Sequence, residues 1–78
     1  MMEGRIMPLT MAPPGKEVTL IAVYGGRGIR MRLHSLGLIP GVKLRVLSNN
    51  GTGPLMVAVM DSRVALGWGM AHKIMVEE

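Results

Sequence analysis

The side chains best suited to acid–base or metal chemistry are scarce in this sequence and lie far apart. Histidine occurs twice, at His34 and His72, and neither has a second histidine or a carboxylate at the spacing that a metal site uses. Asp61 is the one carboxylate between Glu17 and Glu77. No nucleophile, base and orienting group can be assembled from this inventory. We therefore predict no catalytic residue, no metal site, no cofactor and no enzymatic activity; His34 with a carboxylate from elsewhere in the fold stays the alternative to solvated histidines.

Sulfur offers no clearer site. Cysteine is absent, which excludes disulfides, thiolate metal ligands and cysteine nucleophiles. Nine methionines are present, but apart from the adjacent Met1 and Met2 they do not form the close clusters that would hold a soft metal such as Cu(I). We interpret the methionines as core-filling side chains, with a few exposed on an adaptable binding surface.

A glycine-rich segment, Gly25-Gly26-Arg27-Gly28, separates an expected strand from an expected helix. Such loops can bind phosphate at the helix N-terminus. The Lys-Ser/Thr pair of a nucleotide-binding loop is missing, however, and the chain is too short for a nucleotide-binding α/β sheet. We interpret the segment as a turn that needs a positive φ angle.

The helix that follows carries a cluster of positive charge. Arg27, Arg30 and His34 lie on one side of it, and Arg32 lies on the opposite flank. These residues form either a solvated face that keeps a small protein soluble or a patch that attracts an acidic partner. The sequence leaves both interpretations open.

Three apolar residues extend the candidate partner surface. Leu38 and Ile39 stand at the tip of a turn, where we expect them to be exposed and useful only when a partner covers them. Trp68 lies between two glycines and is either a core residue or an exposed anchor. The predicted partner-binding residues are Arg27, Arg30, His34, Leu38, Ile39 and Trp68.

Hydrophobic patterning predicts the elements that hold these residues. Strands are expected over 16–24, 42–46, 55–60, 63–66 and 73–76, with a helical turn within 67–72. The segment 55–60 has no polar side and should be a central strand. Between 29 and 36 the period becomes helical and places Ile29, Leu33 and Leu36 on the buried face. The alternating residues 7–11 are expected to lie against a sheet edge.

Proline and glycine mark the turns. Pro14-Gly15 and Pro40-Gly41 form an internal echo, since each pair precedes a strand of similar pattern. Gly37 is placed to end the helix. We expect Gly15, Gly37, Pro40 and Gly41 to serve backbone geometry and not chemistry.

Length and charge set the remaining bounds. The 78 residues suffice for one domain over 1–78, with 1–7 as a flexible arm. An all-β fold with one short helix is expected, closed into a small five-stranded barrel because closure removes apolar sheet edges. The net charge of +4 favours an acidic partner but is modest for a nucleic-acid binder. Apolar runs are too short for a transmembrane helix or a signal peptide, so we expect a cytoplasmic protein.

Four blocks of the sequence, in order, resemble the FeoA family. They are Pro8-Leu9-Thr10 with Pro14-Gly15, the Gly- and Arg-rich run 25–33, the Leu-Gly-Leu-x-Pro-Gly motif at 36–41, and Arg63-Val64-Ala65-Leu66 with the Ala-x-x-Ile-x-Val close at 71–76. The chain is also similar to the C-terminal domain of diphtheria-toxin-repressor-type regulators. Gly67-Trp68-Gly69 departs from the family pattern, in which acidic, helix-favouring residues are common.

The resemblance implies an SH3-like barrel that assists ferrous iron transport. Its implied partner is the cytosolic domain of a FeoB-type transporter, so that the membrane is met only indirectly, and weak self-association is a further expectation. The alternative is a small basic barrel that binds RNA or another nucleic acid. The absence of Phe and the isolation of Tyr24 and Trp68 count against that alternative, because base-stacking platforms are missing, and we predict no nucleic-acid partner.

Overall fold

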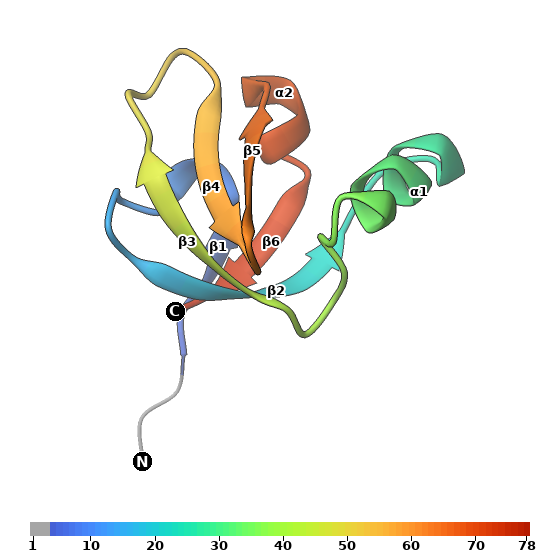
Figure 1. Cartoon of the computed structure of the whole chain (residues 1–78), viewed down its shortest axis with the longest axis horizontal. Helices are drawn as coiled ribbons and strands as arrows, with labels where there is room; N and C mark the ends of the chain where they lie inside the picture. The colour runs from blue at the N-terminus through green and yellow to red at the C-terminus, as the bar shows by residue number, and fades with distance from the viewer. Residues whose placement is uncertain (1–3) are drawn as a thin grey trace.

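The structure, a computed structural model, describes residues 4–78 as one six-stranded antiparallel sheet with short helices (Figure 1). Neighbouring strands follow the order β1-β6-β2-β3-β4-β5. The elements are β1 (Ile6–Pro8), the 3-10 helix η1 (Leu9–Met11), β2 (Glu17–Val23), α1 (Arg27–Ser35), β3 (Lys43–Ser48), β4 (Leu55–Val59), β5 (Ser62–Leu66), α2 (Trp68–Ala71) and β6 (Ile74–Glu77).

The hydrophobic period of the sequence predicted the positions of most of these strands and helices. All five predicted strands are present, and β4 lies between β3 and β5 as expected for its apolar sequence. The hairpin loop is Met60-Asp61, and Ser62 already belongs to β5. The alternating segment near the N-terminus does lie at a sheet edge, because β1 pairs with β6. The predicted flexible arm is therefore wrong for Ile6 and Met7, while residues 1–3 fall outside the described part.

The inner side of the sheet is filled almost entirely by Leu, Val and Ile. In β2, β3, β4 and β6 the buried side chains recur at every second position. Leu20, Leu44, Val57 and Val76 are examples that are completely or almost completely buried. Among the methionines of residues 4–78, only Met7 belongs to this buried core. The interpretation of the methionines as core-filling is therefore wrong. Met56 and Met75 occupy outer strand positions, Met60 lies in the hairpin loop, and the other three belong to the short helices, because Leu and Val already fill the inner positions of the strands.

The expected closed five-stranded barrel is not what forms. The sheet has six strands, and its end strands β1 and β5 do not pair with each other. The apolar interior between them is covered by η1 and α2, whose Leu9 and Ala71 are completely buried. Thr10 Oγ1 and His72 Nδ1, 3.3 Å apart, share a hydrogen bond between these two elements. Side-chain packing thus encloses the core where backbone pairing does not.

The two Pro-Gly turns occupy equivalent places at opposite ends of the β2–β3 pair. Gly15 N–H donates to Val46 O over 2.7 Å, and Gly41 N–H donates to Leu20 O over the same distance. The φ angles of Gly15 and Gly41 are 87° and 96°, a region that favours glycine. The echo in the sequence is therefore a local two-fold arrangement, in which each turn leads into one strand and is tied to the end of the other.

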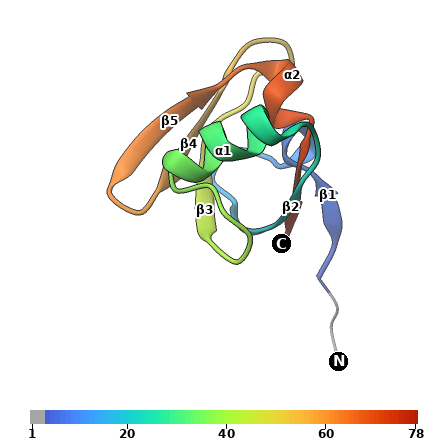
Figure 2. The same ribbon diagram turned by 90° about the vertical axis from the view of Figure 1, so that its right-hand side faces the viewer.

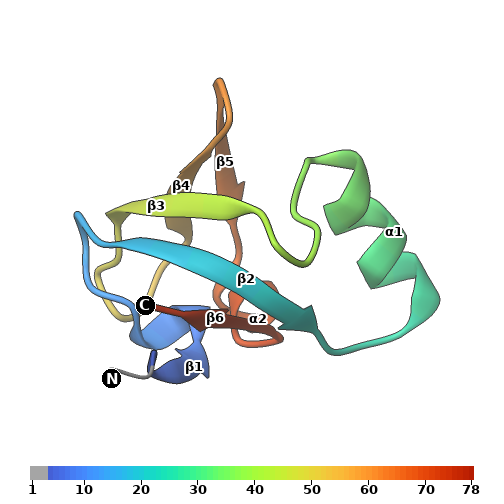
Figure 3. The same ribbon diagram turned by 90° about the horizontal axis from the view of Figure 1, so that it is seen from below.

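Helix α1 projects from the side of the sheet (Figures 1 and 3). Leu33 is its one fully buried residue, and Ile29 is half-buried. Leu36 was expected on the same buried face but is 41 % exposed. It is the C-terminal cap of α1, with φ −90° and ψ 1°, so it no longer follows the helical period. In the described part of the chain, no helix is both long and apolar enough to cross a bilayer.

Candidate functional site

A groove of about 460 Å³ lies between α1, the end of β2 and the turn that follows α1. Figure 2 looks towards α1, which lies between the β4–β5 hairpin and the β2 strand in that view. We name this hollow the α1 groove. Its lining residues are Ile21, Ala22, Val23, Arg30, His34, Leu38, Ile39 and Pro40.

Most of the lining of the α1 groove is apolar, and part of it is accessible. Ile21 and Ile39 are 37 % and 36 % exposed, whereas Leu38 is 1 % exposed and forms the floor. Arg30 and His34, both exposed, stand one helical turn apart on the side of α1 that meets the groove. The groove therefore combines an aliphatic floor with a cationic or protonatable wall.

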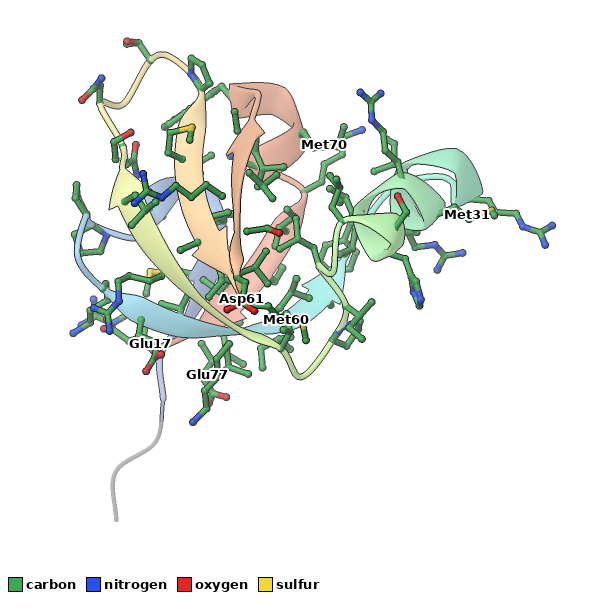
Figure 4. The ribbon with its side chains drawn as sticks, in the orientation of Figure 1. Glu17, Met31, Met60, Asp61, Met70 and Glu77 are labelled. Carbon is green, nitrogen blue, oxygen red and sulfur yellow. The ribbon has the colours of Figure 1, made fainter. Side chains whose placement is uncertain are left out.

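A second hollow, of about 510 Å³, lies against the outer surface of α1 and shares Arg30 and His34 with the α1 groove. Arg27, Met31 and Ser35 complete its lining. Met31 is 62 % exposed and extends from α1 in Figure 4. The two hollows together make α1 a ridge with accessible surface on both sides.

Within residues 4–78, the positive charge of α1 has no ion-pair partner. No carboxylate of the described residues lines either hollow, and Glu17, Asp61 and Glu77, labelled in Figure 4, all belong to the sheet or its loops. Among residues 4–78 the ion pairs join Glu78 to Arg5 and to Lys16, over 3.9 and 3.5 Å. The arginines of α1 form none of these pairs. An incoming carboxylate would thus meet guanidinium groups with no internal ion pair to break.

The structure brings five of the six predicted partner-binding residues to one region: Arg27, Arg30, His34, Leu38 and Ile39. The expectation that Leu38 is exposed is wrong. The chain folds back after Gly37, whose φ is 88°, and Leu38 N–H donates to Leu33 O over 2.9 Å, which carries the Leu38 side chain into the core. A Leu38→Glu variant should therefore unfold the protein, since it buries an unpaired charge.

Trp68 is not part of this region. It begins α2, is half-buried, packs against the core and lines neither hollow. It is thus partly the core residue and partly the exposed side chain that the sequence left as alternatives. A role of Trp68 in binding a partner stays a prediction.

Sequence reasoning missed the β2 side of the groove. Ile21, Ala22 and Val23 belong to the strand predicted over 16–24 and were not among the predicted partner-binding residues, yet Ile21 is exposed and the other two are half-buried. Between Leu20 and Ala22 the register of β2 against β6 shifts by a bulge. A bulge turns the following side chains and re-aims a strand. No residue type in this stretch signals that change.

The groups around the α1 groove are apolar and cationic, and the described part of the chain brings no acidic or histidine cluster to them. Within residues 4–78, no three His, Asp or Glu side chains lie close enough together to hold a metal ion. His34 faces the groove and His72 lies at the end of α2, so the two histidines are on separate elements. The chemistry that the α1 groove fits is contact with a segment that is apolar on one side and acidic at its rim.

Comparison with known proteins provides independent evidence for the family of this chain. The model of the FeoA domain family matches residues 7–78. A protein of Methanocaldococcus jannaschii named Fe(2+) transport protein A is 41 % identical over 71 residues, which cover 91 % of this chain and 85 % of that protein.

Solved structures agree on the fold. The crystal structure of an iron uptake regulatory protein, FeoA, superposes with a TM-score of 0.89 at 34 % identity, covering 94 % of this chain and 97 % of that one. FeoA of Stenotrophomonas maltophilia, an SH3 domain protein in complex with zinc, gives 0.78 at 28 % identity, with 90 % and 88 % covered. The SH3-like class predicted from the sequence is confirmed, although the sheet is open and six-stranded.

The similarity to metal-dependent repressors also holds for the fold. A manganese-dependent transcriptional repressor matches with a TM-score of 0.87 at 23 % identity, over 99 % of this chain but 44 % of its own. At that identity the likeness extends to the fold alone. The family match over nearly the whole chain and the identity to the archaeal relative lead to one assignment: this chain belongs to the FeoA domain family.

Proposed function

We propose that this protein is a non-enzymatic accessory protein of ferrous iron uptake. It acts in the cytoplasm by contact with the cytosolic part of a FeoB-type membrane transporter, and the α1 groove is the contact surface. Family membership and the name of the archaeal relative, which refers to Fe(2+) transport, support the process. The groove supports the mode of action.

The observation that carries the proposal is the composition of the α1 groove. Ile21 and Ile39 present apolar surface beside Arg30 and His34, and in the part of the chain that the structure describes no carboxylate lines the groove. Exposed apolar surface rimmed by charge of one sign is typical of a protein-binding site. An acidic, partly apolar segment of the transporter's cytosolic domain has the matching chemistry.

The apolar part of the contact is tested with Ile39→Glu. The purified variant is titrated against the cytosolic domain of the transporter by calorimetry. We expect affinity to fall at least about tenfold, because a carboxylate replaces an apolar side chain at the centre of the interface. Leu47→Glu is the matched control, since Leu47 is 37 % exposed on β3 and lines neither hollow. The proposal fails if both variants bind like the wild type, or if both lose binding equally.

The charged part is tested by a pair of substitutions on one helix. Arg30→Glu reverses a charge in the groove, whereas Arg32→Glu makes the same change on the other flank of α1, where it lines neither hollow. We expect Arg30→Glu to slow association several-fold more than Arg32→Glu, with the difference shrinking as salt is added. Equal effects would assign the loss to net charge and not to the groove.

Salt dependence separates this proposal from RNA binding. Each phosphate contact releases counterions, so RNA affinity falls by roughly a thousandfold or more between low and moderate salt when six or more contacts form. An interface with an apolar floor and a few rim charges depends on salt weakly. A steep salt dependence towards RNA, with no binding of the transporter domain, would contradict the proposal.

A further inference from the structure

The two edges of the sheet are protected very differently. Strand β1 has three residues and ends at Pro8, which has no N–H to offer to another strand. Strand β5 has five residues, contains neither proline nor glycine, and pairs with β4 without a bulge. In Figure 2 it forms the outer margin of the ribbon. A regular edge of this kind is a template for pairing with another strand.

The backbone groups on the free side of β5 can be identified from the hairpin. Its loop has two residues, so Val59 and Ser62, which close it, exchange backbone hydrogen bonds, and every second residue of β5 does the same. Arg63 and Ala65 therefore direct their N–H and C=O groups away from β4. No turn or loop hydrogen bond in residues 4–78 uses these groups.

We infer that β5 pairs in antiparallel fashion with β5 of a second copy of this chain, around a two-fold axis at Val64. In this register Arg63 lies opposite Ala65 of the other copy, and Ala65 lies opposite Arg63. Each of the two pairs exchanges both of its backbone hydrogen bonds. The edge is self-complementary because the residue facing each guanidinium group is small and uncharged, so like charges are not directly opposed.

The same register explains two features of the chain that the α1 groove does not use. Met60, in the hairpin loop, is 81 % exposed and has a φ of 54°, a conformation that a Met side chain disfavours. Antiparallel pairing about Val64 puts Met60 at the level of Trp68 of the other copy. Trp68 is half-buried, so part of its indole is available to a polarisable thioether. The contact would cover apolar surface at both ends of the interface.

Size and charge determine how strong this dimer is. One five-residue strand pair with two flanking side-chain contacts buries less than the roughly 1,200 Å² of a stable interface, so we expect a dissociation constant on the order of 0.1–1 mM. Each copy carries a net charge of +4, and the two copies repel. Added salt screens that repulsion, so dimerisation should strengthen as salt rises. No residue of β5 lines the α1 groove, and the inference stands independently of the proposed transporter contact.

The experiment measures weight-average mass by sedimentation equilibrium up to about 1 mM protein, at low and at high salt. We expect a reversible monomer–dimer equilibrium that shifts towards dimer at high salt. Amide resonances of Arg63 and Ala65 and the indole resonance of Trp68 should move with concentration in the same samples. A purely monomeric protein over the whole range, or an equilibrium that weakens with salt, overturns the inference.

Two variants locate the interface. Ala65→Pro removes an outward N–H while leaving the bonds to β4, and should weaken dimerisation at least about tenfold. Met60→Gly relieves the backbone conformation and removes the proposed contact with Trp68, and should weaken it about threefold without loss of folding. Far-UV circular dichroism checks both folds. If Ala65→Pro does not fold, Met60→Gly decides, and unchanged dimerisation in that variant overturns the inference.

Ile39→Glu is the matched control on the other surface. It alters the α1 groove, contributes no residue to β5, and should leave self-association unchanged. Loss of the dimer in Ile39→Glu, with dimerisation retained in the β5 variants, would place the interface at the groove and reject the β5 edge.

Discussion

The sheet and helix α1 are stabilised in opposite ways. In the sheet, alternate residues such as Leu20, Leu44 and Val57 are completely buried, so each strand contributes to one continuous core. In α1 the buried side chain is Leu33, while the arginines and His34 are exposed. The sheet therefore carries the stability of the fold, and α1 carries charge and accessible surface on a lightly anchored element. The partner contact proposed for α1 would therefore leave the core undisturbed.

The largest effect should come from opening the core of the sheet. Leu44→Ala removes a side chain that is 1 % exposed and leaves a cavity, at a cost of about 3 kcal/mol in the free energy of unfolding. Chemical denaturation monitored by circular dichroism measures this, and all probes should report one transition. Loss of helix signal before the sheet signal would mean that α1 depends on the core more than we describe.

Removing the anchor of α1 should be less costly and more local. Leu33→Ala is expected to lower the free energy of unfolding by about 2 kcal/mol, less than Leu44→Ala, because Leu33 anchors a single helix and not the whole sheet. Hydrogen exchange should show faster exchange of the α1 amides, with β3 and β4 affected much less. Uniform acceleration across both regions would contradict the separation of the two.

The turn that joins α1 to β3 depends on a positive φ angle. Gly41→Val should cost about 1–2 kcal/mol, although no atom lies within 4 Å of an added Cβ, because the backbone conformation itself is disfavoured. Thermal unfolding measures the change. Gly26→Ala is the control, since Gly26 has a φ of −72° and equal space. Equal stability of both variants would show that the φ angle is not limiting.

The smallest expected effect is a gain in stability. Gly28→Ala replaces a glycine inside α1, where an added Cβ meets no atom within 4 Å. Because alanine has the higher helix propensity, the free energy of unfolding should rise by about 0.5 kcal/mol. Slower hydrogen exchange in α1, with the β4 amides unchanged, would sharpen the contrast. A drop in stability would indicate that α1 is held in a strained position.

The helix and the sheet also differ in how well the sequence foretold them. Strand positions followed from the period of two, because residues such as Val42, Leu44 and Val46 alternate with charged neighbours. Leu36 and Leu38 were misjudged, since both stand beside Gly37, where the chain leaves the helical period. The groove-facing residues of β2 were missed for a similar reason, because a bulge after Leu20 changes which way they point.

The sequence by itself determined the aliphatic core, the positions of the Pro-Gly turns and the cationic face of α1, because each depends on residue type and local spacing. The tertiary structure alone decided that the sheet stays open, that Leu38 is buried and that Arg30 and His34 border an apolar groove. These outcomes depend on which distant segments pack together. The free energy of that packing comes from the whole chain and cannot be assigned to a local pattern.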